Sequence, residues 1–100
     1  MRIVVKNVGC NPKVKEIEGS LQEMQKIVGG YIQCMPFPNN ILCVLNEEGK
    51  LMNLQPNFVY NSDVIVGNVF FCSAGEEEFE SLTEEQTEFI METMHFYEMD

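Results

Sequence analysis

Two segments of this sequence have the spacing of a helix capping box, and they determine where helices can begin. Ser20 stands three residues before Glu23, so its hydroxyl can accept the Glu23 amide while the carboxylate reaches back over the first turn. Thr83 and Gln86 repeat this spacing before a second amphipathic stretch. We therefore expect one helix that ends at Gly29–Gly30, where glycine suits a C-terminal cap, and a second helix near the C-terminus.

The rest of the chain consists of short apolar runs separated by Gly, Pro and Asn, a pattern typical of β-strands and turns. The expected strands are residues 3–8, 13–18, 31–35, 41–45, 51–54, 58–60 and 64–71, the last with a bulge at Gly67. Residues 46–50 are predicted to be the tight turn of a β-hairpin, residues 36–40 another turn, and residues 73–80 an acidic loop. The predicted fold class is α+β, with a mostly antiparallel sheet of about five or six strands and two helices packed on it, in a single domain over residues 1–100.

The net charge of the chain lies in its last quarter. The formal charge is −10, yet all Lys and Arg residues precede residue 51, and residues 76–100, the acidic loop and C-terminal helix, contain none. Glu84, Glu88 and Glu92 recur at every fourth position and form one carboxylate column on the predicted helix. Such a column is a solubilising face, a docking face for a basic protein, or a mimic of nucleic-acid phosphates, and it argues against direct nucleic-acid binding through this face.

Several kinds of active site have no counterpart in the sequence. The cysteines show no CxxC spacing and His95 is the only histidine, so we expect no catalytic residue, no metal site and no cofactor. No apolar run is long enough to cross a membrane, and charge interrupts the N-terminus too early for a signal peptide. The expectation is a non-enzymatic, cytoplasmic protein.

The richest polar cluster is the turn at residues 46–50. One interpretation is a plain hairpin turn whose side chains satisfy the backbone. In the alternative, Asn46, Glu47 and Lys50 surround a small pocket together with Asn57, and Tyr31 supplies an aromatic face for stacking. Further aromatic residues close in sequence are Phe37, Phe58 and Tyr60.

Several motifs in succession resemble a known family. They are Gly19–Ile32, Asn46–Lys50, Pro56–Asn57 and Asp63–Gly67. The resemblance covers roughly residues 1–97 and is to a family of small proteins from phages and mobile elements of Gram-positive bacteria, catalogued as a domain of unknown function. This sequence has Phe58 where members often have Arg.

The resemblance implies a phage-type protein that counters host defence by binding, in the cytoplasm of a bacterial host. Two hypotheses remain open. In the first, the polar cluster sequesters a nucleotide-like signalling molecule, in a monomer or across a homodimer. In the second, the acidic column at Glu84, Glu88 and Glu92 binds and inhibits a host defence protein.

Overall fold

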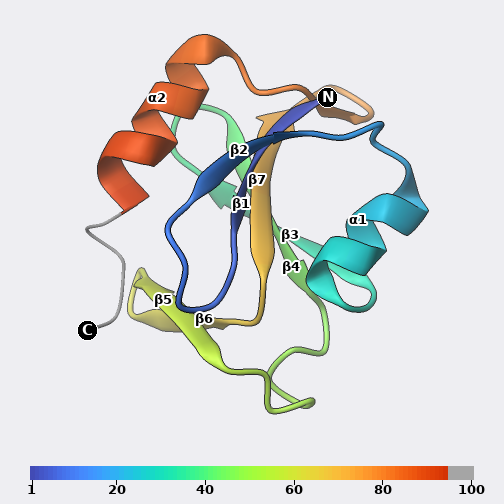
Figure 1. Ribbon diagram of the computed structural model, residues 1–100, viewed down its shortest axis with the longest axis vertical. Helices are drawn as coiled ribbons and strands as arrows, with labels where there is room; N and C mark the ends of the chain where they lie inside the picture. The colour runs from blue at the N-terminus through green and yellow to red at the C-terminus, as the bar shows by residue number, and fades with distance from the viewer. Residues whose placement is uncertain (95–100) are drawn as a thin grey trace.

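The computed structural model describes residues 1–94 (Figure 1). In chain order, its elements are β1 (Arg2–Lys6), β2 (Lys13–Glu16), α1 (Leu21–Val28), β3 (Ile32–Phe37), β4 (Ile41–Asn46), β5 (Pro56–Tyr60), β6 (Asp63–Val66), β7 (Val69–Ala74), β8 (Phe79–Glu80) and α2 (Glu84–Thr93). His95 lies outside the described residues. No helix in the described part of the chain is long and apolar enough to cross a membrane.

The main sheet has the strand order β2-β1-β7-β4-β3, and every described pairing is antiparallel. The short strand β8 pairs with the end of β7. A separate two-stranded sheet consists of the β5–β6 hairpin. The predicted α+β class, with a mainly antiparallel sheet and two helices, is therefore confirmed.

The central strands β4 and β7 are covered on both faces, which explains why they are apolar at almost every position. Phe70 packs toward α1 with Met24 and Val28, whereas Phe71 packs on the opposite face with Ile90 of α2. The β5–β6 hairpin joins α2 on that second face, to which it contributes the buried Phe58 and Ile65. The sheet thus lies between α1 on one side and α2 with the hairpin on the other (Figure 1).

Both predicted N-caps are present, because each depends only on neighbouring residues, but only the one at Thr83 is a complete capping box. Ser20 Oγ accepts the Glu23 amide at 3.1 Å, and the Glu23 carboxylate accepts the Gly19 amide at 2.8 Å. At the start of α2, the Gln86 amide donates to Thr83 Oγ1 at 3.1 Å, and Gln86 Oε1 accepts the amide of the N-cap residue Thr83 itself at 2.9 Å, which completes the box. A cap of this kind contributes about 1 kcal/mol to helix stability.

The predicted hairpin of residues 41–45 and 51–54 is wrong in its second strand, although the chain does turn after β4. Residues 51–54 pair with no strand; the segment after β4 instead folds on itself, with the Met52 amide donating to Glu48 O at 2.9 Å and the Leu54 amide to Gly49 O at 3.0 Å. Both edges of β4 are already occupied, by β3 and by β7, so no returning strand can pair there.

The predicted bulged strand over residues 64–71 is also wrong. Gly67 has φ +78° and ends β6, and β7 then enters the other sheet. Glycine suits this corner because L side chains rarely adopt a φ of this sign, and a Cβ here would also displace the end of Leu54, whose Cδ1 would lie 2.7 Å away. What resembled one bulged strand is the connection between two sheets.

Two further predictions need correction at their boundaries. Pro36 was expected in a turn but lies within β3, which tolerates proline because it is an edge strand. The predicted acidic loop at residues 73–80 begins with the end of β7 and closes with β8, so only its middle is a loop.

Candidate functional site

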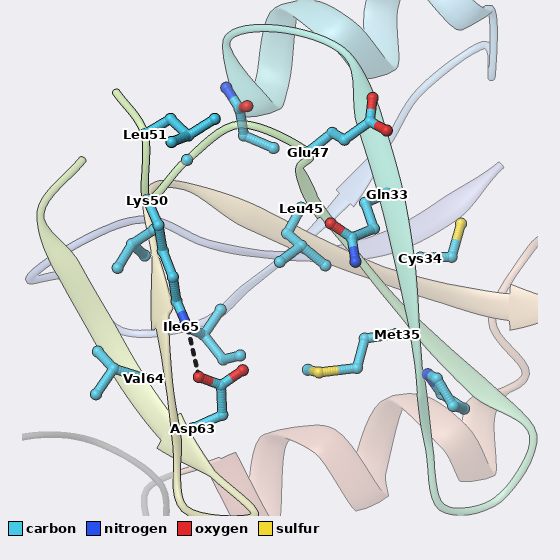
Figure 2. A pocket seen from close by; sticks show the side chains of 14 residues that line it. Gln33, Cys34, Met35, Leu45, Glu47, Lys50, Leu51, Asp63, Val64 and Ile65 are labelled. Atoms are coloured by element: carbon cyan, nitrogen blue, oxygen red, sulfur yellow. Dashed lines mark hydrogen bonds and ion pairs between the residues drawn. The ribbon is translucent and has the colours of Figure 1, made fainter. Parts of the chain in front are cut away.

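A cavity of about 510 Å³ opens on the face of the main sheet that α2 and the hairpin cover. One wall is β3, the opposite wall is β6, and the segment after β4 closes one end (Figure 2). The lining residues are Gln33, Cys34, Met35, Pro36, Leu45, Asn46, Glu47, Gly49, Lys50, Leu51, Asp63, Val64, Ile65 and Val66. Its volume lies within the range of roughly 300–1,000 Å³ that is typical of small-molecule sites.

The floor of the cavity is apolar. Met35 on β3 and Ile65 on β6 point toward each other from opposite walls, and Leu45 on β4 lies between them (Figure 2). Met35 and Leu45 are partly buried against the core, so they offer a surface that is fixed by packing yet still reachable. Apolar side chains of this kind predominate in the linings of small-molecule sites.

The rim of the cavity carries an exposed ion pair. Lys50 Nζ donates to Asp63 Oδ1 at 2.6 Å, as the dashed line in Figure 2 marks. This hydrogen bond lowers the pKa of the Asp63 carboxyl below its usual value. Glu47 and Gln33 are exposed on the same rim, which therefore offers a cation, carboxylates and an amide to a ligand.

The structure brings together three of the five residues that were predicted to bind a small ligand. Asn46, Glu47 and Lys50 line the cavity, whereas Asn57 and Tyr31 do not. Tyr31 lies just before β3 and is 65% exposed. The predicted cluster is thus divided between the cavity and other parts of the molecule.

Asn46 is at the cavity but is engaged by the fold. It is 4% exposed, and its amide nitrogen donates to Val28 O at 3.2 Å, at the end of α1. Its Oδ1 accepts the Glu48 amide at 2.8 Å. Asn46 therefore holds the segment after β4 against α1, and it shapes the cavity rather than offering a free polar group.

Asn57 is buried away from the cavity. Its Nδ2 donates to Lys6 O and to Gly67 O, each at 2.8 Å, and its Oδ1 accepts Lys6 Nζ at 3.0 Å. Lys6 is 3% exposed and, among the described residues, forms no ion pair with a carboxylate. Asn57 thus joins the hairpin to the end of β1 and satisfies a buried ammonium.

The aromatic residues expected near the pocket belong to the core. Phe37 stacks on Tyr60 with ring centroids 4.0 Å apart, and it meets Phe58 and Phe71 edge-on. These rings pack the hairpin onto the sheet and lie outside the cavity lining. Tyr31 is the one predicted aromatic residue with a largely exposed ring.

Sequence reasoning missed Asp63 and the apolar floor. Asp63 was not among the predicted site residues, because its partner Lys50 lies thirteen residues away and no local pattern pairs them. The available signal was its place in the motif Asp63–Gly67, where it is the one charged residue, and the structure leaves it exposed. Met35 and Ile65 resembled ordinary core residues in sequence.

The predicted protein-binding residues lie on α2. Glu84, Glu88 and Glu92 are all exposed, and none forms an ion pair within residues 1–94. Glu84 lies in the first turn of α2, where a negative charge stabilises the helix through the macrodipole. Glu92 lies in the last described turn, where a carboxylate has the opposite effect and no basic residue compensates for it.

No metal centre is apparent in the described part of the chain, where no three His, Cys, Asp or Glu side chains are grouped suitably for an ion. Cys34 lines the cavity, and partial burial raises the pKa of its thiol. Cys43 and Cys72 are buried in the two cores, where desolvation raises their thiol pKa values as well. Of these three cysteines, the buried Cys43 and Cys72 are inert at neutral pH, whereas Cys34 is exposed and accessible.

Residues 1–95 match the domain of unknown function DUF3846. The chain belongs to the DUF3846 family. The match includes all the strands, both helices and every residue of the cavity lining described above. No curated protein and no solved structure matches the chain.

Proposed function

We propose that this DUF3846 chain is a non-enzymatic binding protein that sequesters a nucleotide-like small molecule in the cavity between β3 and β6. The observation that carries the proposal is the composition of the cavity. An apolar floor of Met35, Leu45 and Ile65 adjoins a rim on which Lys50 and Asp63 are exposed.

Each part of a nucleotide has a matching surface. A base covers the apolar floor, and the Lys50 ammonium faces a phosphate. The Asp63 and Glu47 carboxylates accept hydrogen bonds from ribose hydroxyls, and the Gln33 amide is placed to pair with a base edge. None of these roles breaks or forms a covalent bond.

The ion pair between Lys50 and Asp63 does not prevent either residue from contacting a ligand instead. The Lys50 and Asp63 side chains are 65% and 56% exposed, so solvent screens their attraction and the pair contributes little stability. Transfer of the ammonium from Asp63 to a phosphate therefore costs little. The Asp63 carboxylate is then free to accept a hydroxyl.

The biological setting is proposed from the family resemblance. The resemblance implies an association with phages and mobile elements of Gram-positive bacteria, and this implied association favours a protein that counters host defence in the bacterial cytoplasm. In that setting the bound molecule is a host signal, and the protein acts by lowering its free concentration. Neither a cofactor nor a direct nucleic-acid contact is part of the proposal.

Isothermal titration calorimetry against ADP-ribose, a 3′,3′-cyclic dinucleotide and ATP tests this function. We expect saturable heat with at least one, and a loss of affinity of about tenfold in Lys50→Ala because a phosphate contact is removed. Lys13→Ala on β2 is the matched control, since Lys13 is exposed but far from the cavity lining. Absence of heat with all three probes would contradict the proposal.

The acidic column on α2 supports a second candidate function, an inhibitor that binds a host defence protein. The observation that favours it is Glu92, which is exposed at an electrostatically unfavourable helix position without a compensating cation in the described residues. The triple change Glu84→Gln, Glu88→Gln, Glu92→Gln would then abolish the inhibitory activity and its salt dependence. The matched control removes the same charge from the loop, by Glu76→Gln, Glu77→Gln, Glu78→Gln; equal effects of the two triples would reject a specific role for α2.

A further inference from the structure

The two outer strands of the main sheet differ in charge. The edge strand β2 carries Lys13, Lys15 and Glu16, all exposed, and charged residues of this kind protect an edge from pairing with other chains. The other edge strand, β3, has no charged residue. Within the described residues, no strand pairs with its outer side. The sheet therefore has one edge protected by charge and one uncharged edge, on which Pro36 is the only residue without an amide to donate.

The hydrogen-bond alternation tells which groups of β3 face outward. Tyr31 O accepts the Glu47 amide at 2.8 Å, so the backbone of residue 31 faces β4, and residues 33 and 35 share this orientation. The backbone groups of Ile32, Cys34 and Pro36 consequently point away from the sheet. Residues of this outward set donate no amide to β4, so proline, which has no amide, costs no bond between β3 and β4.

We propose that a second copy of this chain pairs antiparallel with β3 about a two-fold axis at Gln33. In this register Ile32 and the partner's Cys34 exchange both of their backbone hydrogen bonds, and the symmetric pair does the same. A register centred on Cys34 would instead place Ile32 opposite the partner's Pro36, which has no amide to donate. The position of the proline thus selects the register.

Charge favours a second copy over other occupants of this edge. The strand itself is uncharged, and the negative charge of the chain resides in residues 76–100 rather than in β3. Two copies therefore meet along β3 without like charges opposite each other. The exposed side chains that come together at the axis are the amides of Gln33 and the partner's Gln33.

This pairing brings Tyr31 to the cavity of the other subunit. Residues 31, 33 and 35 alternate onto one face of the sheet, and this is the face on which Met35 lines the cavity. In the proposed register Tyr31 stands opposite the partner's Met35. The 65% exposed ring then covers the open side of the partner's cavity and supplies the aromatic face that each cavity lacks by itself.

Disulfide trapping of the full chain tests the register without any ligand. Directly opposite residues lie about 4.5 Å apart between Cα atoms, within disulfide reach, whereas diagonal ones lie about 8 Å apart, beyond it. In a Cys10→Ser, Cys34→Ser background, we expect Gln33→Cys to form a covalent dimer under mild oxidation. We also expect a Tyr31→Cys chain mixed with a Met35→Cys chain to form a mixed disulfide.

Three results would overturn the inference. Sedimentation velocity could find only monomer over a concentration series, with neither disulfide formed. The Cys10→Ser chain could instead cross-link efficiently through its native Cys34, which identifies the other register. A dimer could also persist in Cys34→Lys, which places a lysine on the β3 edge; Val14→Lys on β2 is the matched control and should leave the dimer intact.

The role of Tyr31 toward a ligand rests on the proposed function, and its test separates the two claims. With ADP-ribose as the probe, Tyr31→Ala should weaken binding about tenfold, the loss expected for one stacked ring, without changing the dimer. An unchanged affinity of Tyr31→Ala, at concentrations where sedimentation velocity shows that this variant is dimeric, would overturn the composite site and leave the cavity's function intact. A failure of every probe to bind the wild-type chain, at concentrations where sedimentation velocity shows the dimer, would reject the proposed function and leave the β3 pairing intact.

Discussion

Two lysines of this chain donate to side-chain oxygens at similar distances, yet they belong to opposite parts of the molecule. Lys6 is 3% exposed and donates to Asn57 at 3.0 Å, between the main sheet and the hairpin. The Lys50 side chain is 65% exposed and donates to Asp63 at 2.6 Å, on the rim of the cavity. The difference teaches that burial, rather than the length of the contact, separates a structural contact from one that a ligand can replace.

The buried contact should give the largest effect when it is broken. Asn57→Ala removes the acceptor of Lys6 Nζ and both amide donations to backbone carbonyls, so a buried ammonium loses a partner. We expect a loss of about 3 kcal/mol in the free energy of unfolding, measured by urea denaturation. Asn11→Ala, at an exposed loop position, is the control and should change stability by less than about 0.5 kcal/mol. If Asn57→Ala lowered the free energy of unfolding as little as the control does, the buried Lys6 contact could no longer be distinguished from the exposed Lys50 contact.

Asn46 should behave like Asn57 despite its place on the cavity. Asn46→Ala removes the bonds to Val28 O and the Glu48 amide, and we expect a loss of about 2 kcal/mol in the free energy of unfolding. Hydrogen exchange is a second measurement, in which the Glu48 amide should lose protection. If Asn46→Ala weakened ligand binding while stability stayed unchanged, Asn46 would instead be a ligand contact.

These expectations show what could be predicted from the sequence and what could not. The N-caps at Ser20 and Thr83 were predictable because all partners lie within four residues. Asn57 could not be interpreted correctly, since its partner Lys6 is 51 residues away and no local pattern pairs them. The prediction of one strand over residues 64–71 was wrong for the same reason. Strand partners that lie far along the chain decide that β6 and β7 enter different sheets.

The candidate site was predictable only in part. Polar residues in one turn gave Glu47 and Lys50, but the opposite wall of the cavity, β6, comes from a different sheet. Asp63 and Ile65 become site residues only when the hairpin packs against β4, which is a tertiary event. Local sequence therefore identified the polar end of the cavity and missed its apolar floor.

The exposed contact should affect binding rather than folding. Lys50→Ala should leave the urea midpoint nearly unchanged, because solvent screens the pair with Asp63. The affinity for the bound nucleotide should nevertheless fall about tenfold, as calorimetry would show. Lys50→Arg preserves the charge and should retain most of the affinity. A large drop in stability with no change in affinity would place Lys50 with Lys6 as a structural residue.

The smallest expected effect is on the titration of Asp63. Because Lys50 lowers the pKa of this carboxyl in the folded state, the pair adds stability above the unfolded-state pKa of about 4, and that stability is lost as the pH falls through the lower folded-state value. A ¹³C NMR titration should show the Asp63 pKa below its ordinary value and a return toward it in Lys50→Ala. An identical Asp63 titration in both chains would mean that the ion pair is not populated in solution.

The central claim is that the cavity between β3 and β6 binds a nucleotide-like molecule. The most direct measurement is a methyl NMR titration of the full chain with ADP-ribose, a 3′,3′-cyclic dinucleotide and ATP. With at least one of them, we expect saturable shifts at the methyl groups of Met35, Leu45 and Ile65, which form the cavity floor, while Met24 under α1 stays unchanged. No shift with any of the three, or shifts confined to residues outside the cavity, would contradict the claim.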